Sequence, residues 1–225
     1  MKTTHHLLPA ILCTLIFASC KSTESVGRVQ STGKLGDISK FEAENGDKGT
    51  MVWIDPKVNF SQFTKVYIRP ISLRGKIDPN KKDKISSQDR AELSAYFTAA
   101  LKRELGKDYT IVNSPSRGTL DFHFTVTRAS KSVPLLDGAT TLYPTAFLTS
   151  HVKKGVMGTH SFTGRSSMEL EVKDGVTKRR VIGVLSARTG GKELANMFDS
   201  WNDVKAAMDH WAVGARERLA KLRKR

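Results

Sequence analysis

A short apolar segment that ends at a cysteine constrains this chain more than any other feature of its sequence. Lys2 opens the segment, the eleven residues Leu7 to Phe17 form its apolar centre, and Ala18-Ser19 precede Cys20. A run of this length cannot cross a hydrocarbon core, which needs about 20 residues, but it matches the apolar region of a secretory signal. The pattern predicts a lipoprotein signal peptide over residues 1–19 and acylation of Cys20.

This signal predicts that the protein is located at a membrane of the cell envelope. Lys21 follows the cysteine, and lipoproteins without Asp at that position usually reach the outer membrane. We therefore expect a protein held in the outer membrane by acyl chains such as palmitate and facing the periplasm. Cleavage without acylation, which would release a soluble protein, and an uncleaved anchor are the alternatives.

The same segment accounts for both cysteines of the chain. Cys13 leaves with the signal and Cys20 becomes a thioether, so the mature chain has no free thiol. Disulfides, cysteine nucleophiles and thiolate metal sites are thereby excluded. The 206 residues left after removal of 19 from 225 must be stabilised by a packed core, and they suffice for one domain.

The mature chain divides into a tether and a domain. Residues 21–50 are rich in Ser, Gly, Lys and Glu and show no hydrophobic period. Residues 20–50 are therefore expected to hold the acylated cysteine and a flexible tether, with a span of roughly 30 Å. Residues 51–225 are expected to form a single globular domain.

The first half of this domain combines strand and helix patterns. Residues 65–71 alternate and are rich in β-formers, which predicts a strand that ends at Pro70. Ser86 and Asp89 have the spacing of a helix start, and apolar residues at helical spacing follow as far as Gly106. A short strand is expected over residues 109–112.

The second half gives the clearest patterns. Residues 119–127 alternate between apolar and polar side chains, which predicts a half-exposed strand. Residues 165–188 predict a hairpin with a two-residue turn at Asp174-Gly175. A long helix capped at Ser200 is expected to carry an apolar stripe of Val204, Met208, Trp211, Ala215, Leu219 and Leu222. The predicted class is α+β, with a mixed or antiparallel sheet of about five strands and two main helices packed on one face.

Residues 131–164 fit no element of this plan. A structureless insert of this length is unusual in a compact domain and is often functional. It is expected either to cover the core as a loop or to contact a partner or lipid. The candidate partner contacts are Leu136, Leu142, Tyr143 and Phe147, together with Trp201 in the first turn of the last helix. For Trp201 the alternative is a lid on the core.

A formal net charge of +15 usually suggests a nucleic-acid partner, but an exported lipoprotein meets little nucleic acid. Lipid headgroups, glycolipids and peptidoglycan are the anions available in the envelope. The basic loop and the C-terminal tail supply the candidate anion-binding residues: Lys81, Lys82, Lys84, Arg216, Arg218, Lys221, Arg223, Lys224 and Arg225. Helix-dipole placement and solubility are the alternative reason for the basic tail.

The sequence offers no recognisable catalytic, cofactor or metal site. The histidines of the mature chain lack the H-E-x-x-H spacing of zinc proteases, and Gly158 to Gly164 lacks a nucleophile elbow. Gly190-Gly191-Lys192 lacks the first glycine and the Ser/Thr of a phosphate loop. His123 is expected to form an ordinary surface pair with Asp121. We therefore predict a protein that is not an enzyme and binds no cofactor or metal.

Several short motifs in a fixed order resemble the bacterial lipoprotein family of unknown function number 3313. They are the signal with its cysteine, Thr50 to Pro56, Phe63 to Ile68, Leu93 to Val112, Gly164 to Glu171, and Trp211-Ala212. The sequence departs from the family in the hairpin, where Asp174 to Lys178 replaces a frequent Asp-x-x-Thr-Gly. The resemblance implies a small outer-membrane-type lipoprotein and brings no established catalytic residue.

These observations predict a non-enzymatic envelope lipoprotein that acts as a scaffold or accessory subunit of an envelope assembly. Its expected partners are the membrane, through Cys20, and an envelope protein. The alternative is a binding module for anionic peptidoglycan, glycolipid or lipid headgroups that uses the basic loop and the C-terminal helix.

Overall fold

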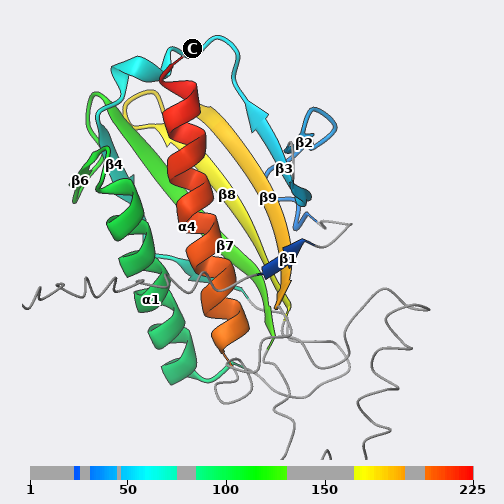
Figure 1. Cartoon of the computed structure of the whole chain (residues 1–225). Helices are drawn as coiled ribbons and strands as arrows, with labels where there is room; N and C mark the ends of the chain where they lie inside the picture. The colour runs from blue at the N-terminus through cyan, green and yellow to red at the C-terminus, as the bar shows by residue number, and fades with distance from the viewer. Residues whose placement is uncertain are drawn as a thin grey trace, which may run out of the picture.

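The computed structural model describes residues 23–25, 31–44, 47–74, 85–130, 165–190 and 201–224. Figure 1 shows a curved sheet with two long helices lying side by side across one face. In chain order the elements are β1 (Thr23–Ser25), β2 (Glu42–Glu44), β3 (Asp47–Ile54), the 3-10 helix η1 (Phe60–Gln62), β4 (Lys65–Ile68), β5 (Ser72–Leu73), α1 (Ser87–Leu105), β6 (Thr110–Val112), β7 (Thr119–Ser130), β8 (Arg165–Asp174), β9 (Arg180–Gly190) and α4 (Asn202–Leu222). No helix among these residues is both long and apolar enough to cross a membrane.

The described strands form one mixed sheet of nine, in the order β2-β3-β9-β8-β7-β4-β6, with β1 paired to β9 and β5 paired to β7. Strand β4 runs parallel to β6 and β7, whereas β7, β8, β9 and β3 are antiparallel neighbours. The α+β class is confirmed, but the expected number of about five strands is wrong. The four strands that were not expected are β1, β2, β5 and β3. Strands β1, β2 and β5 contain only two or three residues each, too few to show a two-residue period, and β3 begins within the segment expected to be a tether.

Both helices pack on the same sheet face, as the sequence predicted. Helix α1 begins where expected, because the Ser86 hydroxyl accepts a hydrogen bond from the Asp89 amide at 3.0 Å. The predicted stripe of α4 is buried over its whole length. It lies over β8 and β9, and its Trp211 packs against Phe97 of α1 with ring centroids 6.0 Å apart. Phe97 in turn packs edge-on against Phe124 of β7 with ring centroids 5.0 Å apart. This face holds the main hydrophobic core.

The start of α4 differs from the prediction. Its N-cap is Trp201, which makes no side-chain cap, and Ser200 lies outside the described residues. Trp201 is only 6% exposed, and its Nε1 donates a hydrogen bond to Asp89 of α1 at 2.9 Å. Of the two expectations for Trp201, this burial fits a lid on the core, because the indole packs within the main core beside the first turns of the two helices.

Residues 31–44 form a packed segment and not the tether expected there. Leu35, 2% exposed, and Phe41 are buried with Leu185 in a second, smaller core on the other face of the sheet. Gly183 of β9 makes room for Phe41, because a Cβ at this position would lie 2.6 Å from the ring. Single apolar residues in a polar segment show no period, so the sequence did not disclose this packing.

The β8–β9 hairpin is present, but its turn is longer than the predicted two residues. Residues 175–179 connect the strands, and the Asp174 amide donates to the Arg179 carbonyl at 3.0 Å. The Asp174 carboxylate accepts from the amides of Val176 and Thr177, each at 2.8 Å. Lys178 has a φ of 59°, a left-handed conformation that normally favours glycine.

Candidate functional site

The sheet face opposite the helices carries polar side chains from four neighbouring strands. In register, Tyr67 of β4 lies beside Asp121 of β7, and His123 of β7 lies beside Glu171 of β8. Successive residues of a strand point to opposite faces, so the apolar alternation that builds the core also gathers these groups on the other side. We call this surface the polar face; it is the candidate functional site.

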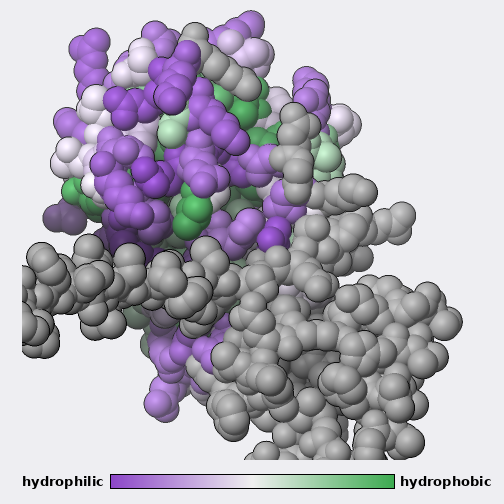
Figure 2. Space-filling model, viewed as in Figure 1, coloured by the Kyte–Doolittle hydropathy of each residue, from purple (hydrophilic) through white to green (hydrophobic). Residues whose placement is uncertain are grey.

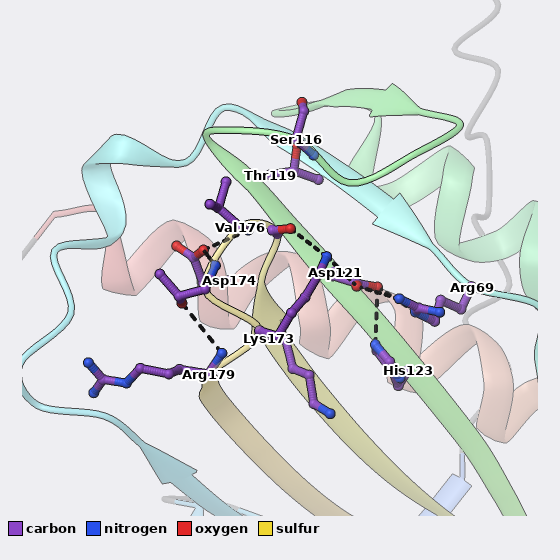
Figure 3. A network of polar contacts seen from close by, with 12 residues as sticks. Arg69, Ser116, Thr119, Asp121, His123, Lys173, Asp174, Val176 and Arg179 are labelled. Atoms are coloured by element: carbon purple, nitrogen blue, oxygen red, sulfur yellow. Dashed lines mark hydrogen bonds and ion pairs between the residues drawn. The ribbon is translucent and has the colours of Figure 1, made fainter.

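Asp121 is the centre of the polar face and is completely buried. The Arg69 guanidinium donates to it through Nε and Nη2, both at 2.9 Å. His123 Nε2 lies 3.1 Å from its Oδ1, and Lys178 Nζ lies 3.8 Å from its Oδ2. Figure 3 shows Asp121 held between Arg69 and His123. The predicted half-exposed strand is thus wrong at Asp121, where surrounding cations replace water.

The electrostatics of this cluster follow from burial and pairing. Burial raises the pKa of Asp121, but the hydrogen bonds from Arg69 and the nearby His123 outweigh it and hold the pKa below its usual value. Burial lowers the pKa of His123, Asp121 raises it and Arg69 lowers it, with a net decrease. His123 is therefore neutral near pH 7, while Asp121 and Arg69 are charged.

Arg69 connects the buried Asp121 carboxylate to the surface of the protein, where it lies beside Tyr67. The Arg69 side chain is 40% exposed although both arms of its guanidinium are bound to Asp121. Its Cζ also lies 5.7 Å from the centre of the Tyr67 ring, within range of a cation–π interaction. Arg69 is thus held in place at the surface, with the Tyr67 ring beside it.

A second ionic pair extends the polar face across β8 and β9. Glu171 accepts from Arg180 Nε at 2.9 Å, and its other oxygen lies 3.1 Å from Lys173 Nζ. Arg180 also donates to the Leu35 carbonyl at 2.8 Å. The polar face is therefore tied to the packed segment 31–44.

The first residues of segment 31–44 are held on the polar face by hydrogen bonds to a buried carboxylate. Glu169, 2% exposed, accepts from the Thr32 amide at 2.5 Å and from the Thr32 hydroxyl at 2.6 Å. Lys34 Nζ donates to the Thr125 hydroxyl at 2.9 Å. Thr125 is consequently buried as well, a second departure from the predicted half-exposed strand.

Two pockets lie at the margins of the sheet. One of about 320 Å³ is lined by Leu35, Gly36, Asp37, Lys40, Phe41, Trp53 and Arg180, where segment 31–44 crosses β9 and β3. The other, of about 380 Å³, surrounds residues 54–60 and Leu222. In the part of the chain that the structure describes, no three His, Cys, Asp or Glu side chains are arranged to hold a metal ion.

The candidate anion-binding residues of the tail are largely occupied within the fold. Arg218 makes a two-pronged contact with Glu44, at 3.1 and 2.7 Å, and Arg216 Nε donates to Asp108 at 2.8 Å. Arg223 Cζ lies 5.2 Å from the Tyr109 ring centre. Lys221 and Lys224 are exposed. Figure 2 shows that the helix side of the domain is mostly hydrophilic.

The remaining sequence candidates lie outside the described residues. They are Cys20, the basic residues Lys81, Lys82, Lys84 and Arg225, and the apolar residues Leu136, Leu142, Tyr143 and Phe147. The sequence analysis missed Tyr67, Arg69, Lys173 and Arg180. The alternation within residues 65–71 and 165–173 places Tyr67, Arg69 and Lys173 on their strands' polar sides, and this was the signal that could have found them.

Comparisons with known proteins identify a family. The family model described as "Protein of unknown function (DUF3313)" matches residues 30–215, so the chain belongs to this family. None of the curated proteins matches the sequence. Among solved structures, a PelC dodecamer from Paraburkholderia phytofirmans is 10% identical with a TM-score of 0.40, covering 76% of this chain and 96% of that one. Protein XCC0632 from Xanthomonas campestris is 8% identical with a TM-score of 0.41, covering 75% and 90%.

Proposed function

We propose that this member of the DUF3313 family is a non-enzymatic lipoprotein of the cell envelope. It is anchored by acyl chains on Cys20 in the outer membrane, faces the periplasm, and serves as a scaffold or accessory subunit of an envelope assembly. The signal and its cysteine support the anchor, as argued from the sequence. The polar face supports the role as a subunit.

The observation that carries the proposal is that a buried carboxylate holds Arg69 in place at the surface, beside the Tyr67 ring. Arg and Tyr are enriched among the residues that dominate protein–protein interfaces. Immobilising such a side chain on binding costs about 0.5–1.5 kcal/mol, and this cost is reduced where the side chain is already held. Arg69, bound by two hydrogen bonds to Asp121, meets this condition.

The alternative, an anion-binding module, uses cations that the fold already employs. Arg218, with a side chain only 10% exposed, neutralises Glu44, and Arg216 neutralises Asp108. Releasing either would leave a carboxylate without its partner, at a cost that an external anion must offset. Lys221, Arg223 and Lys224 are the exposed cations of the described tail, and Arg223 lies over the Tyr109 ring.

Photo-crosslinking in living cells separates the two roles. A photoreactive phenylalanine replaces Tyr67 on the polar face or, as a matched control, the exposed Val213 on the outer side of α4. The proposal expects one stoichiometric protein crosslinked from position 67 and lost in an Arg69→Ala background, with no such product from position 213. Capture of only glycan or lipid, from a probe at Lys221, would instead support the binding module.

The anchor is tested separately with Cys20→Ala. We expect this variant to lose labelling by radioactive palmitate and to leave the membrane fraction or remain unprocessed. A correctly cleaved Cys20→Ala protein that still fractionates with membranes would contradict the anchor.

A further inference from the structure

The chain is attached to the sheet almost immediately after the proposed lipidation site. Strand β1 pairs antiparallel with the end of β9, with Thr23 opposite Gly190, Glu24 opposite Thr189 and Ser25 opposite Arg188. Cys20 stands three residues before Thr23. Because an extended residue spans at most about 3.6 Å, the three residues from Cys20 to Thr23 can span at most roughly 11 Å.

The direction of β1 determines the side of the domain from which the anchor leaves. Strand β9 runs from the hairpin at residues 175–179 to Gly190, and the antiparallel β1 runs back from Thr23 toward the body of the sheet. Followed backward from Thr23, the chain therefore leads past the Gly190 end of the sheet. The anchor and the hairpin lie at opposite ends.

Strands β7, β8, β9 and β1 come together at the Gly190 end of the sheet. Ser130 of β7 pairs with Arg165 of β8, Arg165 pairs with Thr189 of β9, and Thr189 pairs with Glu24 of β1. These four backbone positions form a row across the sheet. Both helices also begin near this end, as the Trp201–Asp89 hydrogen bond and Figure 1 show.

The two ends of the domain are far apart along the strands. Strand β8 has ten residues between Arg165 and Asp174, which corresponds to roughly 33 Å at about 3.3 Å per residue. The hairpin and the C-terminal end of α4 occupy that far end (Figure 1). The two ends of the domain are therefore distinguishable by their distance from a membrane.

We propose that the Gly190 end of the sheet lies against the phospholipid surface, with the hairpin pointing away from it. This inference rests on the proposed acylation of Cys20. With at most two residues between Cys20 and β1, the acyl chains enter the bilayer next to the row from Ser130 to Glu24. The polar face then stands to the side of this contact, accessible to a neighbouring envelope protein.

Energy transfer from single labelled positions to the membrane tests the orientation. The acylated mature chain has no free thiol, so one introduced cysteine is the only labelling site. Gln88→Cys, exposed in the first turn of α1, places a donor dye near the Gly190 end, and Val176→Cys places it in the hairpin. The acylated proteins are reconstituted into phosphatidylethanolamine–phosphatidylglycerol vesicles that carry an acceptor dye on a lipid headgroup.

The expected result is a greater loss of donor emission at position 88 than at position 176. Equal losses, or a greater loss at position 176, in protein that floats with the vesicles would overturn the orientation and leave the anchor intact. Protein that fails to float would instead contradict the acylation on which the inference rests. The readout thus separates the two failures.

A second variant tests the role of β1. Thr23→Pro with Glu24→Pro removes an amide donor to β9 whichever of the two amides faces it, and Thr23→Ala with Glu24→Ala is the matched control. We expect the prolines to release β1 from β9 and to reduce the difference between positions 88 and 176. An unchanged difference with the prolines would show that β1 does not set the orientation.

Discussion

The two faces of the central sheet are held by different forces. On the helix face, Phe122, Phe124 and their neighbours on β7 are buried among apolar side chains of α1 and α4. On the polar face, the intervening residues Asp121 and Thr125 are equally buried, but each is bound by a specific cation from another part of the chain. Strand β7 therefore contributes apolar burial, which has no preferred direction, on one side of the sheet. On the other side it contributes ion pairs and hydrogen bonds with specific partners.

The difference shows which interactions stabilise the domain and which determine where individual side chains and segments are placed. Apolar burial stabilises in proportion to area and tolerates exchange among side chains of similar volume. Charged hydrogen bonds require both partners, because a buried charge left alone is costly. The helix face should therefore determine how stable the domain is, and the polar face should determine how segment 31–44 and the surface side chains are placed.

The largest expected effect is on the helix face. Phe124→Ala, at a residue 2% exposed, should reduce the free energy of unfolding by about 3–5 kcal/mol because it leaves a cavity beside Phe97. Urea unfolding followed by tryptophan fluorescence measures this loss. Phe124→Leu, which keeps most of the volume, is the control, and equal losses in both variants would argue against a cavity.

The polar face should respond to charge more than to volume. Asp121→Ala should reduce the free energy of unfolding by about 2 kcal/mol, less than for a fully buried pair because Arg69 reaches solvent. Asp121→Asn keeps the shape and removes the charge. If the Asn variant were as stable as the wild type, the charge would be unimportant and the polar face would behave like the helix face.

The helix face was predictable from the sequence, and the reason is its regular period. Leu120 to Val126 alternate over a long strand, and the stripe of α4 repeats at helical spacing, so each element identified its own buried side. The Ser86 cap was predictable because capping depends on a few adjacent residues. Local patterns of this kind do not require knowledge of which elements become neighbours.

The polar face could be predicted only in part, because its pairs join residues far apart in the sequence. Arg69 and Asp121 are 52 residues apart, and Thr32 and Glu169 are 137 apart. Nothing near Asp121 indicates that its partner follows β4. For the same reason Arg218, assigned to anion binding from the composition of the tail, proved to be paired with Glu44, 174 residues away.

A glycine provides a sharper test of how segment 31–44 is held. Gly183→Ala places a methyl group 2.6 Å from the Phe41 ring and should reduce the free energy of unfolding by about 1–2 kcal/mol through overpacking. Amide exchange should increase within residues 31–44 and stay unchanged in α1. Gly183→Ala combined with Phe41→Leu should restore part of the protection, because the smaller side chain leaves room for the methyl group.

The outcome of this test bears directly on the comparison of the faces. Faster exchange throughout the domain would mean that segment 31–44 belongs to the same cooperative unit as the helix face. Faster exchange confined to the segment would make it a separately held element. Gly214→Ala, at a helix position with nothing near the added methyl group, is the matched control and should not change exchange in the segment.

The smallest expected effect is a loss of stability in mild acid that arises from both sides of the sheet. Burial lowers the pKa of His123, which faces Asp121, Arg69, Glu171 and Lys173, and it also lowers the pKa of His210 on α4. Below the unfolded-state pKa, near 6.5, the unfolded chain therefore binds more protons than the folded one, and stability falls as pH falls toward the folded-state values.

Replacing each histidine separately assigns this loss to a side of the sheet. His123→Gln and His210→Gln should each flatten the dependence of the urea midpoint on pH between about 7 and 5, since glutamine does not titrate. The Asp121 carboxylate limits the decrease in the pKa of His123. Introducing His123→Asn in the Asp121→Asn background tests whether the carboxylate has this effect. A midpoint that rises as pH falls through this range would contradict the lowered pKa values, because the folded chain would then bind more protons than the unfolded one.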